Sequence, residues 1–130
     1  MHERSALQRR RGFILAVLVL AWLGAFVATH VPAPDIPRRI LELGQVVLHA
    51  VGFFALSSLF LLTLAAFGVR PYRRAAVVLV AMALYAAADE YTQQFVHRSS
   101  ELADWLVDTV ATAVAVAAWE GIFRLTRRTA

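Results

Sequence analysis

The chain has 130 residues, of which 60% are hydrophobic and only 17% are charged, and its mean hydropathy is +0.63. A soluble domain of this length has no core large enough for so much apolar surface, so the composition predicts that a lipid bilayer forms part of the solvent. The basic pI of about 10.6 does not indicate nucleic-acid binding, because the arginines flank apolar segments instead of forming one basic stripe. The chain has no cysteine, which excludes disulfides, thiolate metal ligands and thiol nucleophiles.

The first half of the chain contains two apolar segments separated by a proline-rich stretch. Residues 12–30 follow a group of arginines, and their length favours a retained membrane helix over a cleaved signal peptide, whose apolar core has roughly 7–15 residues. The prolines of Val31–Arg39 predict a loop, because proline disrupts a helix interior, and residues 38–45 are expected to continue it as a short interfacial turn. A second membrane helix is predicted over residues 46–67, interrupted only by His49.

The second half contains two further apolar segments. A tight turn over residues 68–74 leads to a third predicted helix over residues 75–95. The fourth helix is predicted over residues 101–123, and Glu120 and Arg124, four positions apart near its end, are expected to form an ion pair. The four segments together predict an all-α membrane protein built as a four-helix bundle.

The distribution of arginine predicts the orientation of this bundle. Ten of the 13 basic residues lie in the N-terminal segment, the second loop and the C-terminal segment, and the other three lie in the first and third loops. Because positively charged segments stay on the cytoplasmic side, both termini are expected to be cytoplasmic. The sequence thus predicts a single transmembrane domain over residues 1–130, with the third loop on the outer side.

Most ionisable residues of the apolar region fall within the stretch Asp89–Asp108. Ionisable residues are costly in a membrane and are usually functional. The alternative is a structural role, in which Gln93 and a neighbouring helix hold the carboxylates by hydrogen bonds. Asp89 and Glu90 point about 100° apart on a helix, whereas Gln93 lies within reach of either. We expect His49 to converge with these three residues between the second, third and fourth helices. The first helix, whose apolar run has no ionisable residue, is expected to be mainly scaffold.

Asp104 and Asp108 are four positions apart and share a helix face with Ala111 and Ala115. Small residues allow a neighbouring helix to approach closely, so this face is expected to point into the bundle. Asp104 also suits the first turn of a helix, where the dipole favours an acid. Arg98, the one base in the third loop, either neutralises these acids or binds a phosphate or carboxylate of a ligand.

The histidine and the carboxylates together contain suitable metal ligands, namely His49, Asp89, Glu90, Asp104 and Asp108. The sequence has no HExxH motif or other tight ligand spacing, so we predict neither a metal nor another cofactor. His49 is interpreted first as a polar partner across helices, with general base and metal ligand as alternatives. No catalytic residue is assigned from the sequence.

The polar motif resembles the signature of the VanZ-like membrane proteins. The resemblance covers roughly residues 31–118, and His49, followed by Phe53 and Leu56, resembles the family's earlier motif. The main motif is Asp89-Glu90-x-x-Gln93-x-Phe95, followed by Arg98, Asp104 and Asp108.

The resemblance implies a small multi-pass protein of the bacterial cytoplasmic membrane, with a link to low-level teicoplanin resistance. The expected function is to bind or modulate a lipid-linked or cell-wall ligand through an outward-facing polar pocket. The alternative is a small membrane enzyme that uses His49 with Asp89 or Glu90 as acid and base, and a structural subunit of a larger complex is a third possibility. The expected partners are membrane lipid and an envelope ligand or another membrane protein, and not nucleic acid.

Overall fold

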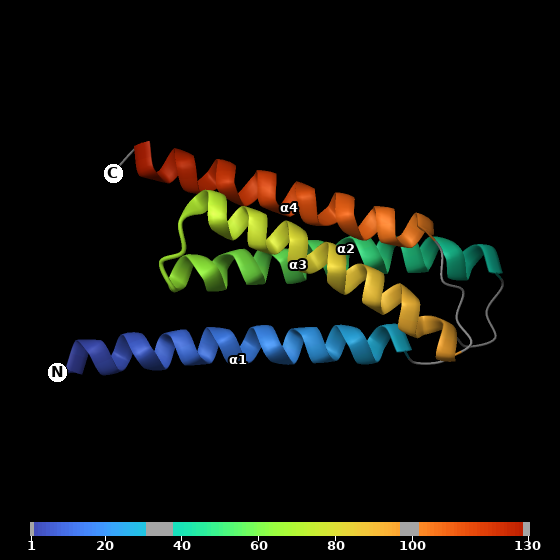
Figure 1. Ribbon diagram of the computed structural model, residues 1–130, viewed down its shortest axis with the longest axis horizontal. Coiled ribbons are helices and arrows are strands. Elements are labelled where there is room, and N and C mark those ends of the chain that lie inside the picture. Colours follow the sequence, from blue (N-terminus) through green and yellow to red (C-terminus); the bar gives the residue numbers. More distant parts are fainter. Residues whose placement is uncertain (1, 31–37, 97–101, 129–130) are drawn as a thin grey trace.

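A computed structural model describes residues 2–30, 38–96 and 102–128 of the chain. Within these residues the chain runs up and down the bundle in alternating directions, so that α1 begins at the same end at which α4 finishes (Figure 1). No strand is present in the described part, and the predicted all-α, four-helix architecture is confirmed. The elements are α1 (His2–His30), α2 (Arg38–Ala66), α3 (Pro71–Gln93), the short 3-10 helix η1 (Gln94–Val96) and α4 (Leu102–Arg128).

All four α-helices contain a stretch that is long and apolar enough to cross a membrane. Large apolar side chains remain on their outer surfaces, as at Leu20 and Leu84, which are 68% and 67% exposed. Lipid is the natural neighbour of such surfaces, and the chain is therefore a multi-pass membrane protein. The apolar stretches are Ala6–His30, Gly44–Ala66, Pro71–Gln93 and Leu102–Thr126.

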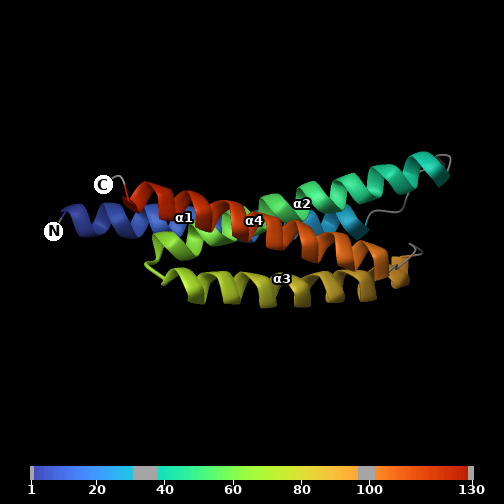
Figure 2. The same cartoon turned by 90° about the horizontal axis from the view of Figure 1, so that it is seen from above.

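The helices begin earlier or end later than their apolar stretches predict. The expected interfacial turn over residues 38–45 is wrong, because α2 begins at Arg38 and its first turns extend beyond the neighbouring helices (Figures 1 and 2). α1 likewise starts at His2 instead of residue 12, and α4 ends at Arg128 instead of residue 123. Arginine is a good helix former, so a helix continues past the membrane boundary that hydropathy detects. The proline-rich residues 31–37 lie outside the described residues.

A compact turn joins α2 to α3. Gly68 adopts a φ of 77°, in the left-handed region that glycine enters without steric cost. The backbone N–H of Gly68 donates to the carbonyl of Ala65 at 2.9 Å, and that of Val69 donates to Leu64 at 3.0 Å, which is the Schellman arrangement that ends a helix. Pro71 then starts α3 in the first-turn position where its missing N–H costs nothing.

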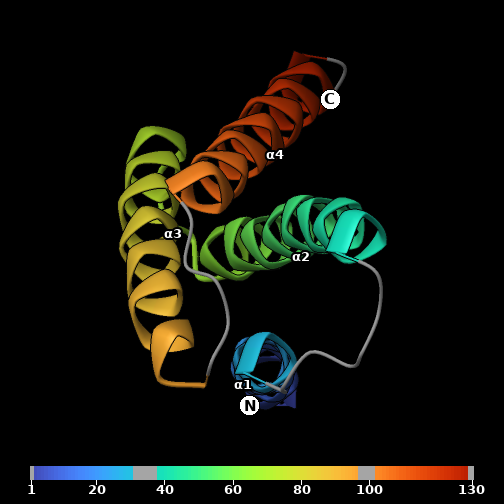
Figure 3. The same ribbon diagram turned by 90° about the vertical axis from the view of Figure 1, so that its right-hand side faces the viewer.

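The four helices do not contribute equally to the core. α1 and α4 lie on opposite sides of α2, and α3 lies beside them (Figure 3). The buried apolar cluster comes from α2, α3 and α4 and includes Leu61, Val78 and Met82. α1 joins it through Trp22, whose ring stacks on Tyr85 at 5.4 Å between centroids. α1 is therefore attached along one side and exposes most of its surface to lipid.

A buried ion pair lies between α3 and α4, near the end of the bundle where the chain starts and finishes. The guanidinium of Arg74 donates to both carboxylate oxygens of Glu120, through Nε at 2.6 Å and Nη2 at 3.0 Å. Its Cζ also lies 4.3 Å from the centroid of the Phe123 ring. The ion pair expected between Glu120 and Arg124 is therefore wrong: the partner of Glu120 comes from another helix, and Arg124 is exposed.

Candidate functional site

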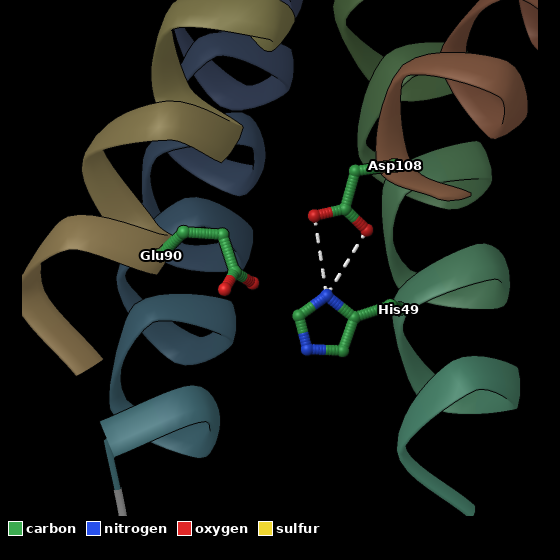
Figure 4. A group of neighbouring side chains, drawn as sticks. All are labelled: His49, Glu90 and Asp108. Carbon is green, nitrogen blue, oxygen red and sulfur yellow. Dashed lines mark hydrogen bonds and ion pairs between the residues drawn. The ribbon is translucent and has the colours of Figure 1, made fainter. Parts of the chain in front are cut away.

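Three buried ionisable side chains meet between α2, α3 and α4: His49, Glu90 and Asp108 (Figure 4). Nδ1 of His49 donates to both carboxylate oxygens of Asp108, at 3.0 and 3.1 Å. The carboxylate of Glu90 points from α3 toward this pair (Figure 4), and one donor atom from each of the three residues lies within 4.8 Å of the others. We call these three residues the polar trio.

Neighbouring residues on α2 and α4 fix the position of His49 and Asp108. The ring of Phe53, one turn along α2, lies parallel to the His49 ring with 6.3 Å between centroids. One further turn along, Ser57 donates to the hydroxyl of Thr112 on α4 at 3.0 Å. α2 and α4 thus form two polar bridges in succession, and both are buried. Such bridges fix the rotation of each helix, because a one-residue shift would expose these groups to hydrocarbon.

The acidic face predicted for α4 is confirmed. Asp104 and Asp108 are both buried, and so are Ala111 and Ala115 below them. Asp104 lies in the first turn of the helix, as expected. Arg98, the predicted partner or ligand-binding base, lies outside the described residues.

Asp89, although adjacent to Glu90, belongs to a different cluster. Its Oδ2 accepts from Nε2 of Gln93 at 2.7 Å, and its Oδ1 accepts from the hydroxyl of Thr29 on α1 at 2.8 Å. Nδ1 of His30 lies 3.8 Å from the same oxygen. The bond predicted between Gln93 and Asp89 is confirmed, but the expected convergence of all four residues between α2, α3 and α4 is only partly right. The angle of about 100° between adjacent helix positions sends Asp89 toward α1 and Glu90 toward α2 and α4.

The first helix therefore contributes to the polar chemistry, and the expectation that it is mainly scaffold is wrong. Besides the bond from Thr29 to Asp89, Nε2 of His30 lies 2.9 Å from the hydroxyl of Thr92 on α3. The sequence signal for this contact is a Thr-His pair that ends an otherwise apolar run. From hydropathy alone, that pair only marks the end of the apolar run. The polar groups of α3 need hydrogen-bond partners at the same level of the bundle, and Thr29 and His30 supply them.

A cavity of about 100 Å³ with a mainly apolar wall lies beside His49, one member of the polar trio. Small and apolar side chains of α1 and α2 form most of its wall, and the polar groups on it are Thr29, His49 and Tyr85. Among the described residues the buried Tyr85 hydroxyl has no hydrogen-bond partner. Leu48 and Ala28, which also line the cavity, are exposed on α2 and α1, so the cavity opens to the surface between these two helices.

The trio offers two kinds of chemistry. A histidine whose Nδ1 is held by a carboxylate has its ring orientation and tautomer fixed, which leaves Nε2 for proton exchange or for a ligand. A second carboxylate beside such a pair supplies another acceptor, proton carrier or metal ligand. The trio therefore suits a polar or charged ligand, and its position beside an apolar cavity suits an amphiphilic one.

The fold and the site together define a multi-pass helical membrane protein with ionisable groups enclosed between its helices. No family model, curated protein or solved structure matches the chain. The resemblance to the VanZ-like proteins therefore stays a prediction.

Proposed function

We propose that this chain is a VanZ-like protein of the bacterial cytoplasmic membrane that binds or modulates an amphiphilic envelope ligand, lipid-linked or derived from the cell wall. The polar part of the ligand contacts the polar trio, and part of its hydrocarbon occupies the adjacent cavity. The observation that carries this proposal is that His49 belongs both to the trio and to the cavity wall. Through this ligand the protein would modify susceptibility to glycopeptides such as teicoplanin.

The size and opening of the cavity support a ligand that remains partly in the bilayer. A volume of about 100 Å³ is smaller than the roughly 150 Å³ cavity that holds benzene, so it accepts a short segment of a chain. The remainder must leave through the opening between α1 and α2. A ligand that lies partly in the cavity and partly in the bilayer enters laterally from the membrane. A water-soluble ligand without an apolar segment would gain little from contact with the apolar cavity wall.

Tyr85 supports a polar group at the inner end of the ligand. A buried hydroxyl without a hydrogen-bond partner costs free energy, and a ligand atom that accepts a hydrogen bond from the Tyr85 hydroxyl removes this cost. Tyr85 lines the same cavity as His49, so one ligand can contact both. Headgroups with phosphate or sugar oxygens fit this donor.

Filling the cavity is expected to displace the ligand. Gly52 lines the cavity, and a Cβ added there meets no heavy atom within 4 Å, so the leucine of Gly52→Leu can be attached without a backbone clash and adds volume at the cavity wall. We expect wild-type protein purified in mild detergent to retain a lipid-linked species, identified by mass spectrometry of extracted lipids, and Gly52→Leu to retain at least about tenfold less. A tenfold loss corresponds to about 1.4 kcal/mol of binding free energy.

Gly24→Leu is the matched control, because Gly24 also has no heavy atom within 4 Å of an added Cβ but lies on the exposed surface of α1, away from the cavity. The control protein should retain the same species as the wild type. Equal retention in both variants, or recovery of bulk phospholipid alone from the wild type, would contradict the proposal.

The proposed orientation places both termini in the cytoplasm and the polar trio in the outer half of the membrane. Because the chain has no cysteine, single cysteines report accessibility without background. We expect cysteines at positions 33 and 99 to react with an impermeant thiol reagent in intact cells, and a cysteine at position 72 to react only after lysis. Labelling of position 72 from outside would reverse the orientation.

A membrane enzyme is the second candidate, and the pairing of His49 with Asp108 favours it. An imidazole oriented by one carboxylate, with Glu90 nearby, provides an acid and a base in one place. In this arrangement Glu90 is the second acid–base group, because Asp89 is held by Gln93 and Thr29. Accumulation of a precursor lipid in deletion and Glu90→Gln strains would indicate turnover, whereas unchanged lipid pools indicate binding alone.

A further inference from the structure

We propose that His49, Glu90 and Asp108 bind one divalent transition-metal ion of the zinc, manganese or iron(II) class. This site goes beyond the proposed envelope ligand and does not depend on it, because the metal ligands are residues of the chain itself. The proposal is contrary to the expectation from sequence that no metal is bound. That expectation considers only the spacing of ligands within one helix, whereas these three ligands come from α2, α3 and α4.

The distances within the trio match a coordination sphere. Nitrogen and oxygen ligands lie about 2.0–2.2 Å from zinc, so two adjacent ligands on one ion are roughly 3.0–3.5 Å apart. The 3.0 Å between Nδ1 of His49 and Oδ1 of Asp108 falls within this range. One donor atom of Glu90 lies within 4.8 Å of both other residues, and rotation about the flexible torsions of its side chain brings it closer. The ion would replace the proton that His49 and Asp108 now share, and that proton would pass to the buffer.

The donor set selects the class of ion. Calcium and magnesium prefer oxygen ligands only, whereas imidazole together with carboxylates suits zinc, manganese and iron(II). Helical bundles commonly build such sites from histidine and carboxylates on facing helices. Three protein ligands leave at least one coordination position open for a further ligand. His49, one of the three, also lines the cavity.

Asp89 provides an internal comparison. It is as deeply buried as Asp108 and is adjacent to Glu90 in sequence, but Gln93 and Thr29 hold its oxygens and it does not belong to the trio. A metal attracted only by the general negative charge of the region would respond to Asp89 and Glu90 alike. A metal bound by the trio would respond mainly to Glu90.

The test is a titration of delipidated, chelator-treated protein in detergent with Co²⁺, followed by displacement with Zn²⁺. We expect one Co²⁺ per chain, with visible absorption from a coordinated ion. Glu90→Gln and His49→Gln should each weaken binding by at least about tenfold, since even residues outside the first coordination sphere affect affinity by 10- to 100-fold. Asp89→Asn should weaken it by no more than about threefold, and circular dichroism verifies that each variant keeps its helices.

Absence of stoichiometric binding by the wild type would overturn the site, and so would an equal loss in Asp89→Asn and Glu90→Gln. If the substituted proteins do not fold, pulsed electron paramagnetic resonance of wild-type protein with Mn²⁺ still decides, because a histidine ligand produces coupling to nitrogen. Absence of that coupling overturns the proposal. Since the titration contains no lipid, its outcome is separate from the lipid-retention result with Gly52→Leu.

Discussion

Replacing Arg74 by glutamine is expected to lower the free energy of unfolding by about 3–5 kcal/mol, which is the usual cost of breaking a buried ion pair. Arg74 is 2% exposed and donates to both oxygens of Glu120. The variant leaves that carboxylate buried without its cation. The same replacement at Arg124, which is exposed, should change stability by less than about 1 kcal/mol.

Unfolding in detergent or bicelles, followed by loss of helical signal, measures both variants under identical conditions. The pair decides which arginine is the partner of Glu120, because sequence spacing favours Arg124 and the structure favours Arg74. Equal effects of the two replacements would contradict the interhelical pairing. The double change Arg74→Met with Glu120→Leu should recover most of the lost stability, since well-packed apolar residues often replace a buried ion pair without loss.

The features that follow from local periodicity could be predicted from the sequence. The lengths of the apolar runs predict four membrane-crossing helices, and the structure contains them. The spacing of Asp104, Asp108, Ala111 and Ala115 predicts one face, and that face is buried. Each of these inferences depends only on the helical repeat and on the length needed to cross hydrocarbon.

The partners of the buried polar groups could not be predicted, because they depend on the rotation and tilt of whole helices. Hydropathy does not indicate that Thr29 of α1 donates a hydrogen bond to Asp89, or that Asp108 on α4 is the hydrogen-bond partner of Nδ1 of His49. Hydropathy also marks the membrane boundary instead of the helix end, so it does not predict that α2 begins as early as Arg38.

Lipid on the outside reverses the usual arrangement of a folded protein. Many large apolar side chains of this chain face outward, whereas buried positions include His49, Arg74, Asp89 and Asp108. Apolar contact with lipid is as favourable as contact with another helix, so these polar pairs carry much of the specificity of helix association. In two clusters, Arg74–Glu120 and Asp89–Gln93–Thr29, side chains of the same cluster donate hydrogen bonds to both oxygens of the buried carboxylate. The polar trio differs because an ionisable member, His49, lines the cavity, whereas the Asp89 cluster contributes only the uncharged Thr29 to its wall.

Under the proposed function, replacing Asp108 by asparagine is expected to leave the bundle folded but to remove most of the retained ligand. The amide keeps the shape of the carboxylate and one acceptor oxygen, but it removes the charge and turns the other oxygen into a donor facing Nδ1 of His49. Loss of this charge-assisted bond should cost about 1.5–3 kcal/mol. If ligand binding needs the imidazole in this orientation, an equal loss of binding free energy lowers the affinity, and with it the amount of retained ligand, roughly 10- to 150-fold.

The control for this change is Thr112→Val, which removes the neighbouring bridge from Ser57 between the same two helices without touching the trio. It should lower the free energy of unfolding by about 0.5–1.5 kcal/mol and leave the amount of retained ligand unchanged. Helicity, unfolding free energy and extracted lipid are measured on both variants and on the wild type. A folded Asp108→Asn protein that retains the ligand as well as Thr112→Val does would make Asp108 a structural partner of His49, and Glu90 and His49 would then be the remaining candidates for ligand contact.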